Sequence, residues 1–252
     1  MADAGAPPLL EVAITSKAHG RGATSVAVIE DLRFDLERDT ITCLLGPSGC
    51  GKTTALRILL GLDHDYVGRV DPPAHSLRCG VVFQDPRLLP WRTVLENVTL
   101  AAPRFPRVAL DGLLDELGIA AWRDHFPNQL SLGLARRVAL ARALAVEPDL
   151  LVLDEAFVSL DQSSAASLRA SVFGAVARRQ ATVLMVTHNI DEALTFSDAV
   201  HILAPRPTKV IRTLEYPTPR AARDSLWMET ERRRLASINE VFLRPGEAFV
   251  IA

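Results

Sequence analysis

One glycine-rich stretch carries the clearest chemical signal in the sequence, because it ends in a lysine followed by threonines. It has the pattern of a glycine, four residues and then Gly-Lys-Thr. Glycines let backbone N–H groups curl around phosphate oxygens where a side chain would block the approach. The lysine supplies an ammonium for the outer phosphates, and the first threonine hydroxyl is placed to bind Mg²⁺. The pattern predicts binding of a nucleotide with Mg²⁺ by Gly46, Pro47, Ser48, Gly49, Cys50, Gly51, Lys52, Thr53 and Thr54.

Two acids further along the chain form a second group of candidates. The apolar run at 150–153 ends in Asp154 and Glu155. The carboxyl ends of parallel strands lie at the sheet edge where nucleotides bind. There Asp154 can hold Mg²⁺, and Glu155 can polarise a water for attack on the γ-phosphate. Alone, such a pair of acids is often only a solvated turn. The phosphate loop earlier in the same chain favours the functional interpretation.

The elements that must position these residues follow from the apolar runs. Short β-rich runs alternate with helix-like segments, and uninterrupted runs such as 150–153 suit a largely parallel sheet covered on both faces. We therefore expect an α/β fold of the P-loop NTPase type, with an N-terminal antiparallel β addition before Ile41 and an inserted helical subdomain. The expected strands are 10–14, 40–45, 80–83, 150–153, 182–186 and 199–203, and the expected helices are 52–62, 132–145, 164–179 and 224–239.

Length and composition limit the function classes. The 252 residues fit a single domain with a core at about 9–84 and 147–205, a helical insert at about 85–146 and a tail at about 206–252. A net charge of -2 gives no general attraction to nucleic acid or anionic lipid. We expect no membrane segment and no secretory signal. The three cysteines fit no metal or disulfide pattern, which favours reduced thiols.

Taken in this order, the motifs resemble those of the ATPase subunit of ABC (ATP-binding-cassette) transporters, over about residues 9–203. The resemblance implies that Lys52 and Glu155 act in catalysis. It implies that Gln84, which follows an expected strand, contacts Mg²⁺ and links the core to the insert. It also implies that His188, which follows the strand at 182–186, is a switch histidine that contacts the γ-phosphate.

The resemblance further implies a site shared by two subunits. Leu130-Ser131-Leu132-Gly133-Leu134 matches the signature motif of the family, and Ser159-Leu160-Asp161 matches a loop that crosses the dimer interface. In this family two ATPase subunits pack head to tail, with each ATP between the phosphate loop of one and the signature motif of the other. Ser131, Gly133 and Asp161 are therefore expected to reach ATP in trans. The assembly that the resemblance implies is a homodimer of this chain.

Three positions depart from the family pattern. Leu132 stands where a glycine is usual, and Leu134 replaces a polar residue. These changes are either harmless drift or a cause of weakened closure and slow hydrolysis. His19 falls where relatives place an aromatic ring against adenine; it either stacks there with less surface or is an exposed loop histidine.

Three segments indicate a branch of the family. These are residues 84–98, residues 187–194 and residues 204–207, which follow the expected strand at 199–203. They resemble the corresponding segments of the ATPase subunits of bacterial importers for nitrate, taurine and aliphatic sulfonates. The implied partners are permease subunits and, indirectly, a periplasmic or lipid-anchored solute-binding protein, with no nucleic acid. The implied location is the cytoplasmic face of the membrane. Residues 88–91 offer an apolar surface for a partner helix, or else pack inside the insert.

Other classes remain open from the sequence. A cassette ATPase of DNA repair needs long coiled coils, and one of translation carries two cassettes, and this chain shows neither. A nucleotide-binding regulator with weakened hydrolysis would account for Leu132 and Leu134. A small-molecule kinase would share the phosphate loop but leave the signature motif and His188 unexplained.

Overall fold

The computed structural model describes residues 7–20, 24–158 and 162–242. The chain forms two compact units. The first consists of Met1–Ser76 and Leu184–Ala252, and the second of Leu77–Val183. The strand β7 (Thr182–Thr187) runs across the boundary in the sequence. In the described part of the chain, no helix is both long and apolar enough to cross a membrane.

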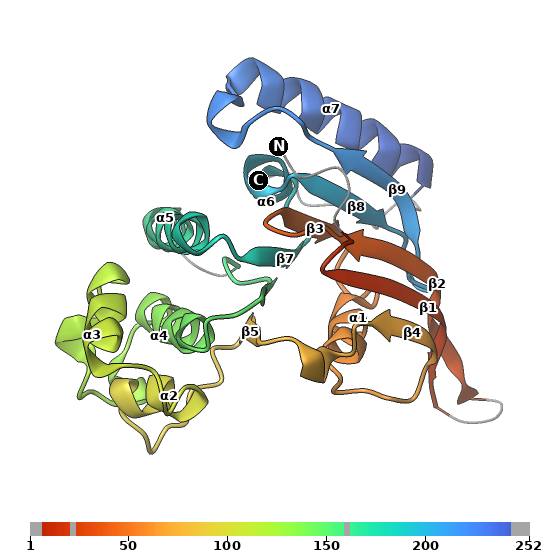
Figure 1. Ribbon diagram of the computed structural model, residues 1–252. Helices are drawn as coiled ribbons and strands as arrows, with labels where there is room; N and C mark the ends of the chain where they lie inside the picture. The colour runs from red at the N-terminus through yellow and green to blue at the C-terminus, as the bar shows by residue number, and fades with distance from the viewer. Residues whose placement is uncertain (1–6, 21–23, 159–161, 243–252) are drawn as a thin grey trace. The chain divides into compact units, whose positions relative to one another are not determined.

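The first unit contains a three-stranded antiparallel sheet in the order β2-β1-β4 (Figure 1). Its strands are β1 (Leu10–His19), β2 (Val26–Leu36) and β4 (Val67–Asp71). Burial alternates along the first half of β1, as expected for a sheet with one covered face. The expected antiparallel addition is confirmed, whereas β4 was not predicted from the sequence.

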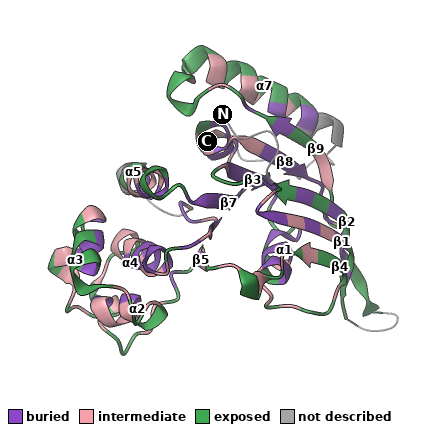
Figure 2. Ribbon diagram, viewed as in Figure 1, coloured by how far each residue is buried: buried purple, intermediate pink, exposed green. Residues whose placement is uncertain are grey.

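The same unit holds the strand that leads into the phosphate loop. All residues of β3 (Ile41–Leu45) are buried, and β3 pairs in parallel with β8 (Ala199–Leu203), with Leu45 opposite Ile202 (Figure 2). β9 (Val210–Glu215) pairs antiparallel with β8. The helices of this unit are α1 (Lys52–Leu59), α6 (Ile190–Phe196) and α7 (Ser225–Phe242).

The second unit combines a parallel strand pair with helices. β5 (Cys79–Val82) pairs in parallel with β6 (Leu150–Asp154). A Cβ on Gly80 would collide with the carbonyl of Ala143, so the glycine lets α4 lie close against β5. The helices are α2 (Val94–Ala101), α3 (Arg107–Glu116), α4 (Leu132–Ala145) and α5 (Gln162–Arg179).

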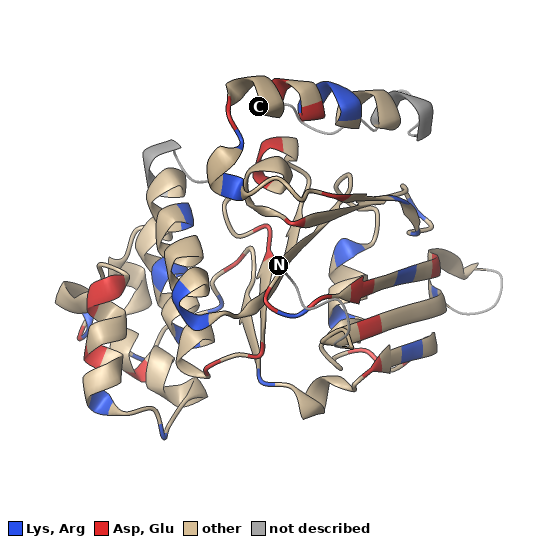
Figure 3. Ribbon diagram, turned by 45° about the horizontal axis from the view of Figure 1, so that its top comes forward, with Lys and Arg blue, Asp and Glu red and all other residues tan. Residues whose placement is uncertain are grey.

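Ion pairs and hydrogen bonds join the helices of the second unit, whose charged residues of both signs are visible in Figure 3. Arg137 of α4 donates to the carbonyl of Leu117 and to the hydroxyl of Ser167, each at 2.7 Å. Glu116 accepts from Arg178 and Arg179 of α5. α4 and the end of α3 are thus bonded to each other, and both are bonded to α5.

Candidate functional site

The phosphate loop holds its lysine ready for an anion. Lys52 is 5% exposed, and its Nζ donates to the carbonyls of Gly46 at 2.8 Å and Pro47 at 2.9 Å. α1 begins at Lys52 with Gly51 as its N-cap, and no side chain caps its first N–H groups. A helix start of this kind, beside an ammonium, suits a phosphate group.

Two glycines of the loop are required by its backbone and its neighbours. Gly49 has φ 76° and Gly51 has φ 121°, in the left-handed region that side chains disfavour. A Cβ on Gly51 would also collide with the hydroxyl of Thr208. The loop therefore owes its shape to the glycine spacing that the motif predicted.

His188 lies next to this loop in the first unit. The N–H of Gly46 donates to the carbonyl of Thr187 at 3.3 Å, so the residue before His188 is bonded to the first residue of the loop. His188 is half-buried. Asn189 then caps α6, since its side chain accepts from the N–H groups of Asp191 and Glu192. The structure thus brings together the predicted loop and the predicted histidine.

A second group of predicted residues gathers in the second unit. In the parallel pair, Val82 of β5 lies opposite Leu153 of β6, so Gln84 and Asp154 emerge at the same edge. Asp154 is buried, Gln84 is exposed, and Glu155 follows with φ 47°. A non-glycine residue in this left-handed region is uncommon.

The signature serine has a clear structural role. Ser131 is the N-cap of α4, and its Oγ accepts from the N–H of Leu134 at 3.3 Å. Leu132 is 42% exposed at the first helical position, and Gly133 is half-buried. The predicted helix start is therefore confirmed, whereas the contribution of Ser131 and Gly133 to ATP in trans stays a prediction.

The remaining predicted residues divide into surface positions and one outside the described residues. Thr53 is exposed and Thr54 half-buried in the first turn of α1, and His19 is exposed at the end of β1. Asp161, with Ser159 and Leu160, lies outside the described residues.

All three cysteines are free, and burial raises the pKa of the Cys50 thiol.

Some residues that shape the site were not predicted. Thr187 and Glu192 form a buried hydrogen bond beside His188, and Arg206 and Thr208 contact carbonyls of the phosphate loop. Glu192 could have been predicted, because it is an acidic residue followed directly by the apolar Ala193 and Leu194. No local pattern marks Thr208, because its contacts are to residues far away in the sequence.

The family model described as "ABC transporter" matches residues 29–158. The chain belongs to the ABC transporter family. Within the family it is 40% identical to the aliphatic sulfonates import ATP-binding protein SsuB 2 of Burkholderia lata, over 96% of this chain and 90% of the relative. It is also 40% identical to SsuB of a Mycobacterium species, over 89% of this chain and 93% of the relative.

Solved ABC cassettes share the fold. A dimeric, post-hydrolysis structure of the ATP-binding cassette MJ0796 with ADP and Pi has a TM-score of 0.72 and 26% identity, and covers 82% of this chain and 98% of that one. This chain is thus an ABC-type ATPase coupled to transport, and the predicted family and fold class are confirmed.

Proposed function

We propose that this chain binds and hydrolyses ATP to drive an importer for aliphatic sulfonates or a similar small solute such as taurine or nitrate. The names of the relatives support the sulfonate assignment. The resemblance of residues 84–98 to this branch points the same way. A role as a regulator without transport is not favoured, since these relatives are import proteins.

The observation that carries the proposal is the buried ammonium of Lys52 at the start of α1. It is bonded to two loop carbonyls, and the loop is bonded in turn to the residue before His188. Binding of ATP phosphates replaces carbonyl partners of the lysine with charged oxygens, which are stronger acceptors. The histidine then donates a hydrogen bond to the γ-phosphate.

The residues expected to hold Mg²⁺ offer suitable donors. Thr53 presents a hydroxyl, Gln84 an amide oxygen and Asp154 a carboxylate, which are the hard oxygen ligands that Mg²⁺ prefers. The bound ion neutralises charge on the phosphates during hydrolysis. Glu155 acts as the base that orients and polarises the attacking water.

The ATP is expected to lie between two copies of the chain. In that arrangement the N-terminus of α4, capped by Ser131, adds a second helix start to the phosphates. Gly133 allows close approach of the backbone, and Asp161 acts across the interface. ATP then joins the subunits, and hydrolysis releases them.

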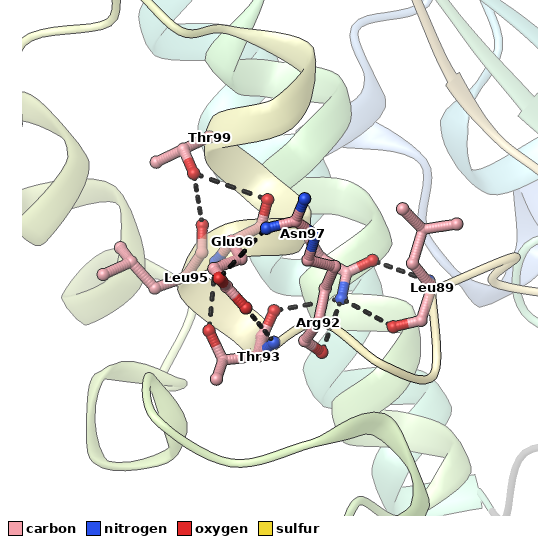
Figure 4. Close-up of polar contacts among 7 residues, drawn as sticks. All are labelled: Leu89, Arg92, Thr93, Leu95, Glu96, Asn97 and Thr99. Carbon is pink, nitrogen blue, oxygen red and sulfur yellow. Dashed lines mark hydrogen bonds and ion pairs between the residues drawn. The ribbon is translucent and has the colours of Figure 1, made fainter.

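The docking surface for the permease is proposed at residues 88–91. Trp91 is 68% exposed, whereas tryptophan is highly buried on average in folded proteins. The loop is held by Asn97, whose amide donates to the carbonyls of Leu89, Arg92 and Thr93 and whose oxygen accepts from the N–H of Leu89 (Figure 4). An apolar side chain on a rigid loop suits a partner helix at the cytoplasmic face of the membrane.

Transport in proteoliposomes tests the proposal. The chain, its permease and its solute-binding protein are reconstituted, and ATP-dependent uptake of an alkanesulfonate, taurine and nitrate is compared. We expect sulfonate uptake that is lost in Trp91→Ala, whereas Val108→Ala, at a residue 86% exposed on α3, retains it. Uptake of another solute alone would reject the sulfonate assignment, and the absence of uptake of any solute would reject the importer role.

A further inference from the structure

The loop between β8 and β9 touches the phosphate loop from the side of β2. The guanidinium of Arg206 donates from Nη2 to the carbonyl of Gly49 at 3.1 Å. Two residues later, the hydroxyl of Thr208 donates to the carbonyl of Cys50. Two consecutive carbonyls of the phosphate loop therefore accept hydrogen bonds from one short segment.

Thr208 is fixed by contacts that do not involve the phosphate loop. Its N–H donates to the carbonyl of Val28 at 2.7 Å, and its own carbonyl accepts from the N–H of Glu30 at 3.0 Å. A hydrogen bond from the N–H of Ala204 to the carbonyl of Lys209, at 2.9 Å, joins the two ends of the segment. Because Thr208 is fully buried and tied to β2 at both backbone groups, its hydroxyl has a set position.

These bonds determine which way the loop N–H groups face. A peptide unit is planar and trans, so its C=O and N–H point in opposite directions. Holding the Cys50 carbonyl toward Thr208 therefore aims the N–H of Gly51 away from β2. The neighbouring peptide is held at both ends, since Arg206 binds the Gly49 carbonyl and the N–H of Cys50 donates to the carbonyl of Pro47 at 3.3 Å.

The contact also accounts for a residue type in the motif. A Cβ on Gly51 would collide with the Thr208 hydroxyl and would lie 3.1 Å from Cγ1 of Val28. Thr208 thus packs against the loop so closely that only glycine fits. The segment and the loop behave as one packed unit.

We propose that Arg206 and Thr208 are positioning residues that pre-organise the phosphate loop for nucleotides with a β-phosphate. They act on the backbone of the loop and touch no phosphate. Ordering the loop before ATP arrives lowers the entropic cost of binding, so their loss weakens affinity. The proposal rests on ATP binding by this loop and adds two residues beyond the motif.

The Thr208→Val variant tests the buried hydroxyl while keeping the side-chain shape. With the purified full chain, the Kd for ATP and for ADP is measured by calorimetry. We expect both to rise by about tenfold, as for the loss of one hydrogen bond to a buried carbonyl. Thr208→Ser restores affinity. The matched control is Thr213→Val on β9, whose hydroxyl contacts His201 and which leaves both Kd values unchanged.

Arg206→Ala provides an independent test, because Arg206 is exposed and its loss spares the core. We expect a several-fold rise in Kd for ATP and ADP, with Arg212→Ala on β9 as the control for an exposed arginine. Kinetics separate positioning from general damage: KM for ATP rises, while kcat at saturating ATP stays within about twofold. A fall in kcat with unchanged KM would overturn the proposal.

The failure of this inference is distinguishable from failure of the proposed function. If wild type does not bind ATP, the ATPase account itself is wrong. If wild type binds ATP and Thr208→Val, Arg206→Ala and the double variant bind it equally well, only the positioning role is rejected. A loss that affects ATP but spares ADP would also reject it, since both nucleotides carry the β-phosphate.

Discussion

The hydroxyl of Thr187 donates a 2.7 Å hydrogen bond to the carboxylate of Glu192, and both side chains are buried. The same hydroxyl accepts from the N–H of Asn189 at 3.1 Å. Thr187 and Asn189 flank His188, so this pair fixes the backbone on either side of the histidine. The histidine is thereby positioned from the first turn of α6.

Removing the carboxylate should loosen the histidine. We expect Glu192→Ala to lower kcat for ATP hydrolysis by about tenfold and to destabilise the fold by about 1–3 kcal/mol, the cost of breaking a buried hydrogen bond. Glu192→Gln keeps an acceptor for the hydroxyl of Thr187. It should therefore recover most of the activity and have the same free energy of unfolding as wild type. The control is Glu229→Gln on α7, an exposed partner of Arg233. Equal kcat in wild type and Glu192→Ala would contradict this positioning role.

Asn97 should be essential for the shape of the loop at 88–91. The carboxylate of Asn97→Asp cannot donate to the three loop carbonyls that the amide of Asn97 binds. We therefore expect the free energy of unfolding, measured by chemical denaturation, to fall by about 2–4 kcal/mol. It should also lose stimulation of ATP hydrolysis by the permease while retaining basal hydrolysis. Val108→Ala, at an exposed site on α3, should change the free energy of unfolding by less than about 0.5 kcal/mol. Full permease stimulation in Asn97→Asp would count against the docking surface.

His201 should make the fold sensitive to acid. Burial lowers its pKa from 6.5 to about 4, because the charged imidazolium is disfavoured inside the protein. The unfolded chain therefore binds a proton below pH 6.5 that the folded chain does not, and stability falls as the pH drops from 6.5 to 4. The contribution is about 3 kcal/mol. His201→Asn should flatten this part of the curve of unfolding free energy against pH, and an unchanged slope would refute the assignment.

Leu132 should slow the motor by adding bulk at the start of α4. We expect Leu132→Gly to raise ATP turnover in the presence of the permease, because the backbone can approach the partner's phosphates more closely. Leu226→Gly is the matched control, since Leu226 is also an exposed leucine in the first turn of a helix. An unchanged turnover in Leu132→Gly would mean that the departure is harmless.

The sequence predicted those features whose signal is local. Residues 132–145 were expected as a helix and form α4 with the same bounds, and the buried runs at 40–45 and 150–153 form strands. β4 was missed because its sequence, Val67–Asp71, is exposed except for the half-buried Val70 and so has no apolar alternation. β9 was missed for a similar reason, since it is an edge strand after a proline-rich turn.

In the candidate site, too, residues with a local sequence signal were predicted and residues without one were not. The spacing of Gly46 to Thr53 identified the phosphate loop, because phosphate binding requires glycines for the backbone and a lysine and a threonine for their side chains. The support from Thr208 depends on contacts with Val28, Glu30 and Cys50, which are distant in sequence. No periodicity or motif encodes such contacts, and only the folded chain reveals them.

ATP hydrolysis by wild type and by Glu155→Gln, measured as phosphate release with the permease present, tests the motor role most directly. The substitution keeps the size of the side chain and removes the base. We expect steady hydrolysis by wild type, a loss of at least about 100-fold in the variant, and an ATP-stabilised dimer of the variant. Equal, slow phosphate release by both proteins would contradict the claim that this chain is the motor of an importer.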